Sequence, residues 1–153
     1  MSIESVKKYI SQYDPRLVPI EFSETTATVE DAARALGVEP AMIAKTILFR
    51  AGDKYALFVT AGDVRANAKK VKGLLGSKPK LATAEEVKEV TGHPIGGVCP
   101  FDLKQSLPIY LDESMKRFKV VYIAAGTPHS ALPITFDQLC AITGGSVVDV
   151  LPA

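Results

Sequence analysis

The 153-residue chain has no tryptophan, two cysteines and two histidines, and these scarcities exclude several kinds of protein. Cys99 and Cys140 lack the CxxC spacing, which favours reduced thiols over a disulfide framework. His93 and His129 form no HxxH or HExxH pattern, so we expect no metal. The chain also lacks the GxxxxGK and GxGxxG loops that bind nucleotide phosphates, and we expect no cofactor.

Long hydrophobic runs are missing as well. No apolar segment approaches the roughly 18 residues that a membrane-spanning helix needs, and charged residues stand near the N-terminus where a signal peptide is apolar. We therefore expect a cytoplasmic protein that does not enter a membrane. With 47% hydrophobic and 23% charged residues, the chain suits a single domain over residues 1–153, which we expect to be a monomer.

Charge is unevenly distributed along the chain. The net charge is +1, but residues 65–80 carry six cations and no acid, which leaves 12 cations against 17 acids elsewhere. Two interpretations are open. A basic segment on an otherwise acidic molecule attracts a polyanion to one face, and a run of lysines is also typical of the solvated side of a helix.

The apolar pattern predicts an α+β domain with a mixed, barrel-like sheet covered by helices. Strands over 43–50 and 54–61, joined by a short polar link, form a hairpin that is apolar on both faces, so helices should cover both sides. Pro19 makes 18–22 an edge strand. In a helix over 67–75 we expect Ala68, Val71, Leu74 and Leu75 to be buried.

The segment 91–101 (TGHPIGGVCPF) has three glycines and two prolines in eleven residues, a mixture that no regular helix or central strand tolerates. It follows a helix with an N-cap threonine, Thr83, and a glutamate three positions later. A shaped loop of this kind serves either a binding site or a tight structural corner, and composition leaves both open.

Lys45 is the most informative single residue. In a strand that starts at Ile43 it shares a face with Ile47 and Phe49. A lysine among large apolar side chains either extends its ammonium to the surface or lines a pocket, where it holds an anion or polarises a carbonyl. Cys99, in the shaped loop, is a less favoured candidate nucleophile paired with His93 or His129.

Several separated stretches together resemble the YbaK/EbsC-type proteins, the stand-alone relatives of the prolyl-tRNA synthetase editing domain. They run in the family's order from about residue 20 to the end of the chain: 43–47, 62–65, 82–87, 91–101, 111–114, 125–129 and 139–150. The lysine, the TGxxxGGVxP loop and the Asp-Glu-Ser turn are the most specific of these. The resemblance implies the family's editing-domain fold and hydrolysis, in trans, of the ester that joins a mischarged amino acid to tRNA.

The resemblance also implies roles for residues. The catalytic set is Lys45 with the backbone of Gly96, Gly97 and Val98, whose N–H groups would stabilise the oxyanion. The substrate-binding set is Thr46, Phe22, Gly126, Thr127 and His129. In this interpretation the basic segment binds tRNA phosphates through Arg65, Lys69, Lys70 and Lys72. The implied partners are misacylated tRNA, with tRNA-Pro preferred, and prolyl-tRNA synthetase.

Three departures from the family pattern qualify these roles. Cys99 stands where serine or proline is common, Asp102 where glycine follows the Pro-Phe pair, and His129 occurs in some subgroups only. Alternatives to a deacylase are a non-catalytic module that binds tRNA or a synthetase, for which Asp102 is the only support, and a thiol enzyme that uses Cys99. Alanine is the favoured amino acid, and cysteine and serine are the alternatives.

Overall fold

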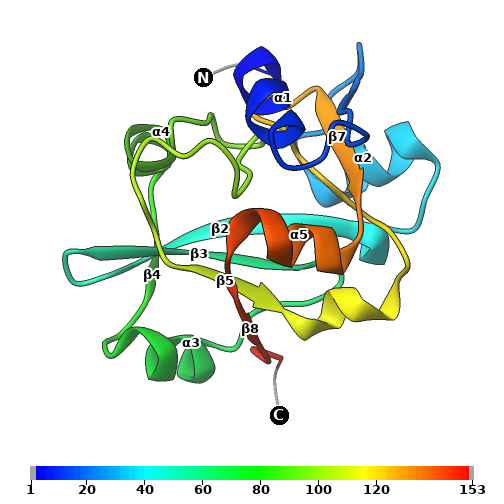
Figure 1. Cartoon of the computed structure of the whole chain (residues 1–153). Helices are drawn as coiled ribbons and strands as arrows, with labels where there is room; N and C mark the ends of the chain where they lie inside the picture. Colours follow the sequence, from blue (N-terminus) through cyan, green and yellow to red (C-terminus); the bar gives the residue numbers. More distant parts are fainter. Residues whose placement is uncertain (1–2, 152–153) are drawn as a thin grey trace.

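The predicted hairpin forms the centre of the sheet in the computed structural model, which describes residues 3–151 of the chain (Figure 1). The helices are α1 (Ile3–Ser11), α2 (Val29–Leu36), α3 (Ala68–Leu75), α4 (Ala84–Thr91) and α5 (Phe136–Thr143), with 3₁₀ turns η1 (Pro40–Met42) and η2 (Glu113–Arg117). The strands are β1 (Ile20–Glu21), β2 (Ile43–Ala51), β3 (Lys54–Ala61), β4 (Lys80–Leu81), β5 (Ile109–Asp112), β6 (Val121–Ile123), β7 (Ser130–Ile134) and β8 (Ser146–Val148).

The sheet is mixed, and the expected fold class is confirmed. Its strand order is β1-β7-β6-β2-β3-β5-β8, with β4 beside β2. The pairs β2–β6, β3–β5 and β5–β8 are parallel and the others are antiparallel. β1 lies at the edge, as predicted for 18–22 from Pro19, but the strand spans only Ile20–Glu21 and Pro19 precedes it. Residues 1–2 and 152–153 of the expected domain lie outside the described residues, and no helix within 3–151 is long and apolar enough to cross a membrane.

Helices cover both faces of the hairpin, as predicted from its apolar character on both sides. On one face Val59 shares a core cluster with side chains of α1 and α5, and Leu57 shares one with side chains of α4. On the other face Phe58 packs with Val71 of α3. Figure 1 shows α5 in front of the sheet and α3 at its lower side. Because side chains alternate along a strand, one hairpin contributes to both cores.

One part of the α3 prediction is wrong. Val71 is fully buried and Leu75 is half-buried, but Ala68 and Leu74 are exposed. α3 has eight residues and packs on the sheet mainly through the stripe that contains Val71. The apolar residues outside this stripe, Ala68 and Leu74, therefore remain exposed.

Threonines begin three of the helices, and each accepts a hydrogen bond from the third residue of its helix. Thr28 accepts from the Asp31 N–H, Thr83 from Glu86 and Thr135 from Gln138, at 3.0, 3.2 and 3.1 Å. In α4 and α5 the third side chain bonds back to the threonine N–H, which completes a capping box. Each cap stabilises the fold by about 1 kcal/mol.

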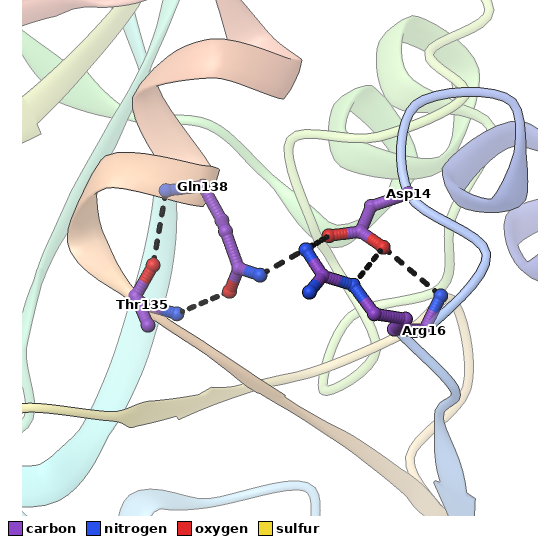
Figure 2. Close-up of polar contacts among 4 residues, drawn as sticks. All are labelled: Asp14, Arg16, Thr135 and Gln138. Atoms are coloured by element: carbon purple, nitrogen blue, oxygen red, sulfur yellow. Dashed lines mark hydrogen bonds and ion pairs between the residues drawn. The ribbon is translucent and has the colours of Figure 1, made fainter.

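The box at the start of α5 also fixes the segment between α1 and β1 (Figure 2). The Gln138 side-chain amide donates to Asp14 Oδ2 at 3.3 Å. Asp14 also accepts from the backbone N–H, Nε and Nη2 of Arg16, each at 3.0 Å. These hydrogen bonds, chiefly from the Arg16 side chain, lower the pKa of Asp14 to about 2. The N-terminal segment is therefore tied to the far end of the chain.

Candidate functional site

A gap in the sheet beside β2 creates the main cavity. β2 pairs with β3 along its length, but on its other side it meets β6 only at Ile43–Ala44 and β4 only at Phe49–Arg50. Between these contacts the edge of β2 has no neighbouring strand within residues 3–151. A cavity of about 350 Å³ opens there, and the consecutive residues 43–48 form one wall.

The main chain of Thr46 faces this gap. The Leu48 carbonyl accepts the Ala82 N–H at 3.0 Å on the side away from β3. Main-chain groups alternate between the two sides of a strand, so the Thr46 N–H and C=O also point away from β3. Thr46 lines the cavity, and its Oγ1 is buried without a hydrogen-bond partner in the described part of the chain. The cavity wall therefore offers one main-chain donor and one acceptor at this position.

Lys45 also lines the cavity. In the register of the hairpin Lys45, Ile47 and Phe49 lie opposite Thr60, Phe58 and Ala56, which confirms that these three residues of β2 share a face. The side chain is half-buried and makes no ion pair within 4.0 Å among residues 3–151. Burial, and to a smaller extent the positive charge of Arg65, lowers the pKa of Lys45.

The glycine-rich loop forms another part of the wall through a tight turn. α4 ends at Gly92, as expected, and the Gly97 N–H then donates to the Pro94 carbonyl at 2.9 Å. Gly96 has φ +86°, the value that the third position of a type II turn requires and that favours glycine. A Cβ on Gly96 would lie 2.9 Å from the Cβ of Ala27. The turn is therefore packed closely against the segment that precedes α2.

Gly97 packs against the turn at residues 126–129. A Cβ on Gly97 would lie 2.7 Å from the backbone N, Cα and C of Thr127, and the Gly126 N–H donates to the Gly97 carbonyl at 3.0 Å. Only a residue without a side chain permits this approach. Two segments nearly thirty positions apart are thus locked together by main-chain contact.

The predicted set of three backbone donors needs one correction. The Gly97 N–H is already bonded to Pro94, and Gly97 does not belong to the cavity wall. Gly96 and Val98 do line the cavity, and their N–H groups make no hydrogen bond within residues 3–151. The structure therefore leaves Gly96 and Val98 as the available donors, because a type II turn consumes the N–H of its fourth residue.

Four of the predicted substrate-binding residues are not among those that line the cavity: Phe22, Gly126, Thr127 and His129. The Phe22 N–H donates to the His129 carbonyl at 2.8 Å, and His129 Nδ1 lies 3.0 Å from the Glu24 carbonyl. A carbonyl only accepts, so Nδ1 is the donor in this hydrogen bond. These contacts extend the β1–β7 pairing and hold the next segment, 26–29, in the wall.

Small apolar residues complete the cavity, and sequence reasoning did not select them. Ala27 and Val29 come from the start of α2, Ala44 from β2 and Ala131 from β7. Alanine and valine carry no chemical signal of a site, so only their position after folding identifies them. Asp, Glu and His side chains are absent from the wall that the described residues form.

Cys99 is unsuited to nucleophilic chemistry. Its side chain is fully buried, and burial raises the pKa of the thiol to about 12, so it remains protonated near neutral pH. His93 Nε2 lies 3.6 Å from Cys99 Sγ but only 2.7 Å from the Phe101 carbonyl. Nε2 must donate to that carbonyl and therefore cannot take a proton from the thiol. His129 is held elsewhere by Glu24, so neither histidine activates Cys99.

Asp102 and the Asp-Glu-Ser turn have structural explanations. Asp102 adopts φ +52°, the left-handed conformation that glycine accepts most readily, so the backbone at this position is the one that glycine would have. Asp112 accepts from the N–H groups of Ser114 and Val150 at 3.0 and 2.7 Å. The Ser114 hydroxyl accepts from the Ala61 N–H at 3.2 Å. The turn ties β3, β5 and the C-terminal segment together.

The basic residues divide into two groups. Lys69, Lys70 and Lys72 belong to α3, on the opposite face of the sheet from α4, and Lys70 pairs with Asp149 at 3.7 Å. Arg65 lies in the loop before α3, close enough to Lys45 to lower its pKa. The last residue of the basic segment, Lys80, lies close to the cavity in the chain, because the next residue, Leu81, lines the cavity.

Comparisons with known proteins agree with this architecture. Residues 23–142 match the model of the aminoacyl-tRNA editing domain. The uncharacterized protein YwhH of Bacillus subtilis (strain 168) is 41% identical over 152 residues, which cover 98% of this chain and 97% of YwhH. Proline–tRNA ligase of Bacillus pumilus is 43% identical over 90 residues, 58% of this chain but 16% of the ligase. A crystal structure of a candidate trans-editing enzyme for prolyl tRNA synthetase aligns with a TM-score of 0.92 and 33% identity, covering 100% of this chain and 99% of its own.

Proposed function

The chain belongs to the aminoacyl-tRNA editing domain family, and we propose that it is a deacylase that hydrolyses the ester of misacylated tRNA in trans. The proposed substrate is tRNA-Pro carrying alanine, with cysteine and serine as alternatives. The observation that carries this proposal is the cavity beside β2, which Lys45, Thr46, Gly96 and Val98 all line.

An aminoacyl ester is intrinsically labile, so the protein needs mainly to position the ester and stabilise the charge that develops on its carbonyl oxygen. The N–H groups of Gly96, in a turn closed by the Gly97–Pro94 hydrogen bond, and of Val98, just after it, would supply the donors. Removing one such donor in other hydrolases reduces the rate about 10²–10³-fold. Donors fixed in advance are effective because they do not reorganise during the reaction.

Lys45 adds the only formal charge among the residues that line the described cavity. We propose that its ammonium holds the terminal ribose or phosphate of the tRNA and strengthens the field at the carbonyl oxygen. Arg65, whose positive charge helps to lower the pKa of Lys45, would add to the attraction for the RNA. No Asp, Glu or His side chain belongs to the wall that residues 3–151 form, so we propose that the attacking water is activated by the substrate's own groups.

The wall composition supports a small amino acid. Ala27, Ala44 and Ala131 are among the lining residues, with Val29 and Val98 beside them. An apolar wall discriminates by volume, and one methylene changes the binding free energy by about 1–3 kcal/mol. Proposed partners are misacylated tRNA and prolyl-tRNA synthetase, and we propose that the protein acts as a cytoplasmic monomer.

The test is a deacylation panel with tRNA-Pro charged with alanine, cysteine or serine, using the wild type, Lys45→Ala and the exposed control Lys54→Ala. We expect release of at least one amino acid above the buffer rate, abolished by Lys45→Ala and unaffected by Lys54→Ala. Absence of release, or equal release with Lys45→Ala, contradicts the proposal. Binding of tRNA without turnover would indicate a non-catalytic module instead.

A further inference from the structure

Two large aliphatic side chains at the cavity are exposed to solvent. Leu81 is 69% exposed and Ile95 is 62% exposed, and both line the cavity beside β2. Exposed aliphatic residues scattered singly over a surface need no explanation, but a pair at the wall of one cavity marks a place where an apolar ligand group binds. The ester of the proposed substrate does not account for them, because it is assigned to Lys45 and Gly96.

Both side chains stand on hydrogen-bonded backbone. Leu81 is in β4 and pairs with Phe49 of β2, and the next residue donates its N–H to the Leu48 carbonyl. Ile95 is the second residue of the type II turn that the Gly97–Pro94 hydrogen bond closes. A rigid apolar surface binds a ligand with little loss of side-chain and loop entropy.

The chain is basic just before Leu81. Lys78 and Lys80 precede it in the chain and make no ion pair within 4.0 Å in the described part of the molecule. Unpaired cations next to an exposed apolar side chain match a ligand that combines an apolar face with negative charge. A nucleotide has this combination, because its base is flat and apolar on both faces and its phosphate is anionic.

We propose that Leu81 and Ile95 bind the base of the unpaired terminal adenosine of tRNA, and that Lys78 and Lys80 interact with the adjoining phosphates. The inference rests on the proposed function, since this adenosine carries the ester. With the ester beside Lys45 and Gly96, the base attached to the same ribose lies at the exposed part of the cavity. Nucleic-acid enzymes hold an unstacked base between aromatic or apolar side chains in this way.

The first experiment measures binding without catalysis. An uncharged RNA minihelix with 2-aminopurine as its terminal base is titrated with the wild type, Leu81→Ala, Ile95→Ala and Val18→Ala. Val18 is the matched control, because it is 59% exposed and does not line the cavity. Burying part of an aliphatic side chain against a base contributes about 1 kcal/mol, so we expect Kd to rise about five-fold for each cavity variant and to stay unchanged for Val18→Ala.

The second experiment assigns the loss to the base. A minihelix with an abasic terminal nucleotide should bind the wild type at least as weakly as the complete minihelix binds Leu81→Ala, because it loses the contacts with both side chains, and it should lose nothing more with that variant. The salt dependence of Kd should be unchanged in Leu81→Ala and reduced in Lys80→Ala, because only the latter removes a charge. A base-independent loss, or no loss, overturns the inference.

The result is separable from the proposed function. If the wild type deacylates charged tRNA while Leu81→Ala and Ile95→Ala bind the minihelix as the wild type does, the adenine site is wrong and the deacylase proposal stands. If the wild type binds the minihelix through these side chains but releases no amino acid, the deacylase proposal fails and the base site stands. Absence of any minihelix binding contradicts the inference directly.

Discussion

Replacing a glycine with alanine adds one methyl group and so tests the packing of the glycine-rich loop. Comparing three glycines separates the cost of backbone strain from the cost of steric overlap. Gly37, at the end of α2, has φ +70°, and a Cβ added there would meet no atom within 4 Å. Gly97 has no unusual φ, but its Cβ would lie 2.7 Å from Thr127 backbone atoms. Gly96 combines φ +86° with a Cβ 2.9 Å from that of Ala27. Alanine at each site thus imposes strain alone, overlap alone, or both.

The magnitudes follow from these geometries. A left-handed conformation costs an L-residue about 1 kcal/mol, which we expect for Gly37→Ala. Overpacking typically costs about 1–3 kcal/mol, and we expect about 3 kcal/mol for Gly97→Ala because the Thr127 main chain cannot rotate away. Gly96→Ala should cost about 2–4 kcal/mol, the sum of the strain and the milder contact with a side-chain methyl.

The assay is urea denaturation followed by circular dichroism, with all three variants compared at one pH and temperature. Gly97→Ala and Gly96→Ala should each lose more unfolding free energy than Gly37→Ala. Deacylation should fall in the two loop variants and persist in Gly37→Ala. A loss at Gly96 or Gly97 no larger than that at Gly37 would refute the close approach between the loop and residues 27 and 127.

Three further predictions concern groups outside the loop turn. Asp102→Gly should stabilise the protein by about 1 kcal/mol in thermal unfolding, because it relieves φ +52° and removes a buried carboxylate oxygen that has no partner within residues 3–151. The pKa of Glu86 is lowered to about 2, chiefly by the Tyr55 hydroxyl, so its contribution to stability is present above pH 4.5 and lost as the pH falls toward 2. Tyr55→Phe should therefore raise this pKa and make stability less pH-dependent in that window, as measured by acid titration of unfolding. Cys99→Ser should retain deacylation, and in the native wild type a thiol reagent should modify half-buried Cys140 before Cys99, with mass spectrometry locating the label.

Patterns among residues that are close in the sequence predicted most of the helices and strands. The threonines at 28, 83 and 135 mark helix starts because each can accept a hydrogen bond from its own first turn. The hairpin followed from two apolar segments around a short polar link. These features depend on neighbours in the sequence. Burial on α3 was less predictable, because whether Leu74 meets a partner depends on where the helix lies on the sheet.

The sequence predicted several of the residues that line the cavity, but not their hydrogen bonds or relative positions. Lys45, Thr46, Gly96 and Val98 were selected from the sequence and do meet at one cavity. The engagement of the Gly97 N–H could not be inferred from composition, because it depends on which turn type the glycines adopt. The contact of Phe22 with His129, outside the cavity lining, likewise depends on the pairing of β1 with β7, a contact between distant segments.

The most direct measurement is single-turnover hydrolysis of alanyl-tRNA-Pro by the wild type, Lys45→Ala and Lys54→Ala. Lys45 lines the cavity with Gly96, whereas Lys54 is exposed at the hairpin turn. Loss of a positive charge at the reacting carbonyl predicts a rate reduction of about 10²-fold or more for Lys45→Ala and none for Lys54→Ala. Equal rates for the two variants, or a wild-type rate equal to hydrolysis in buffer, would contradict the assignment of this cavity as a deacylase site.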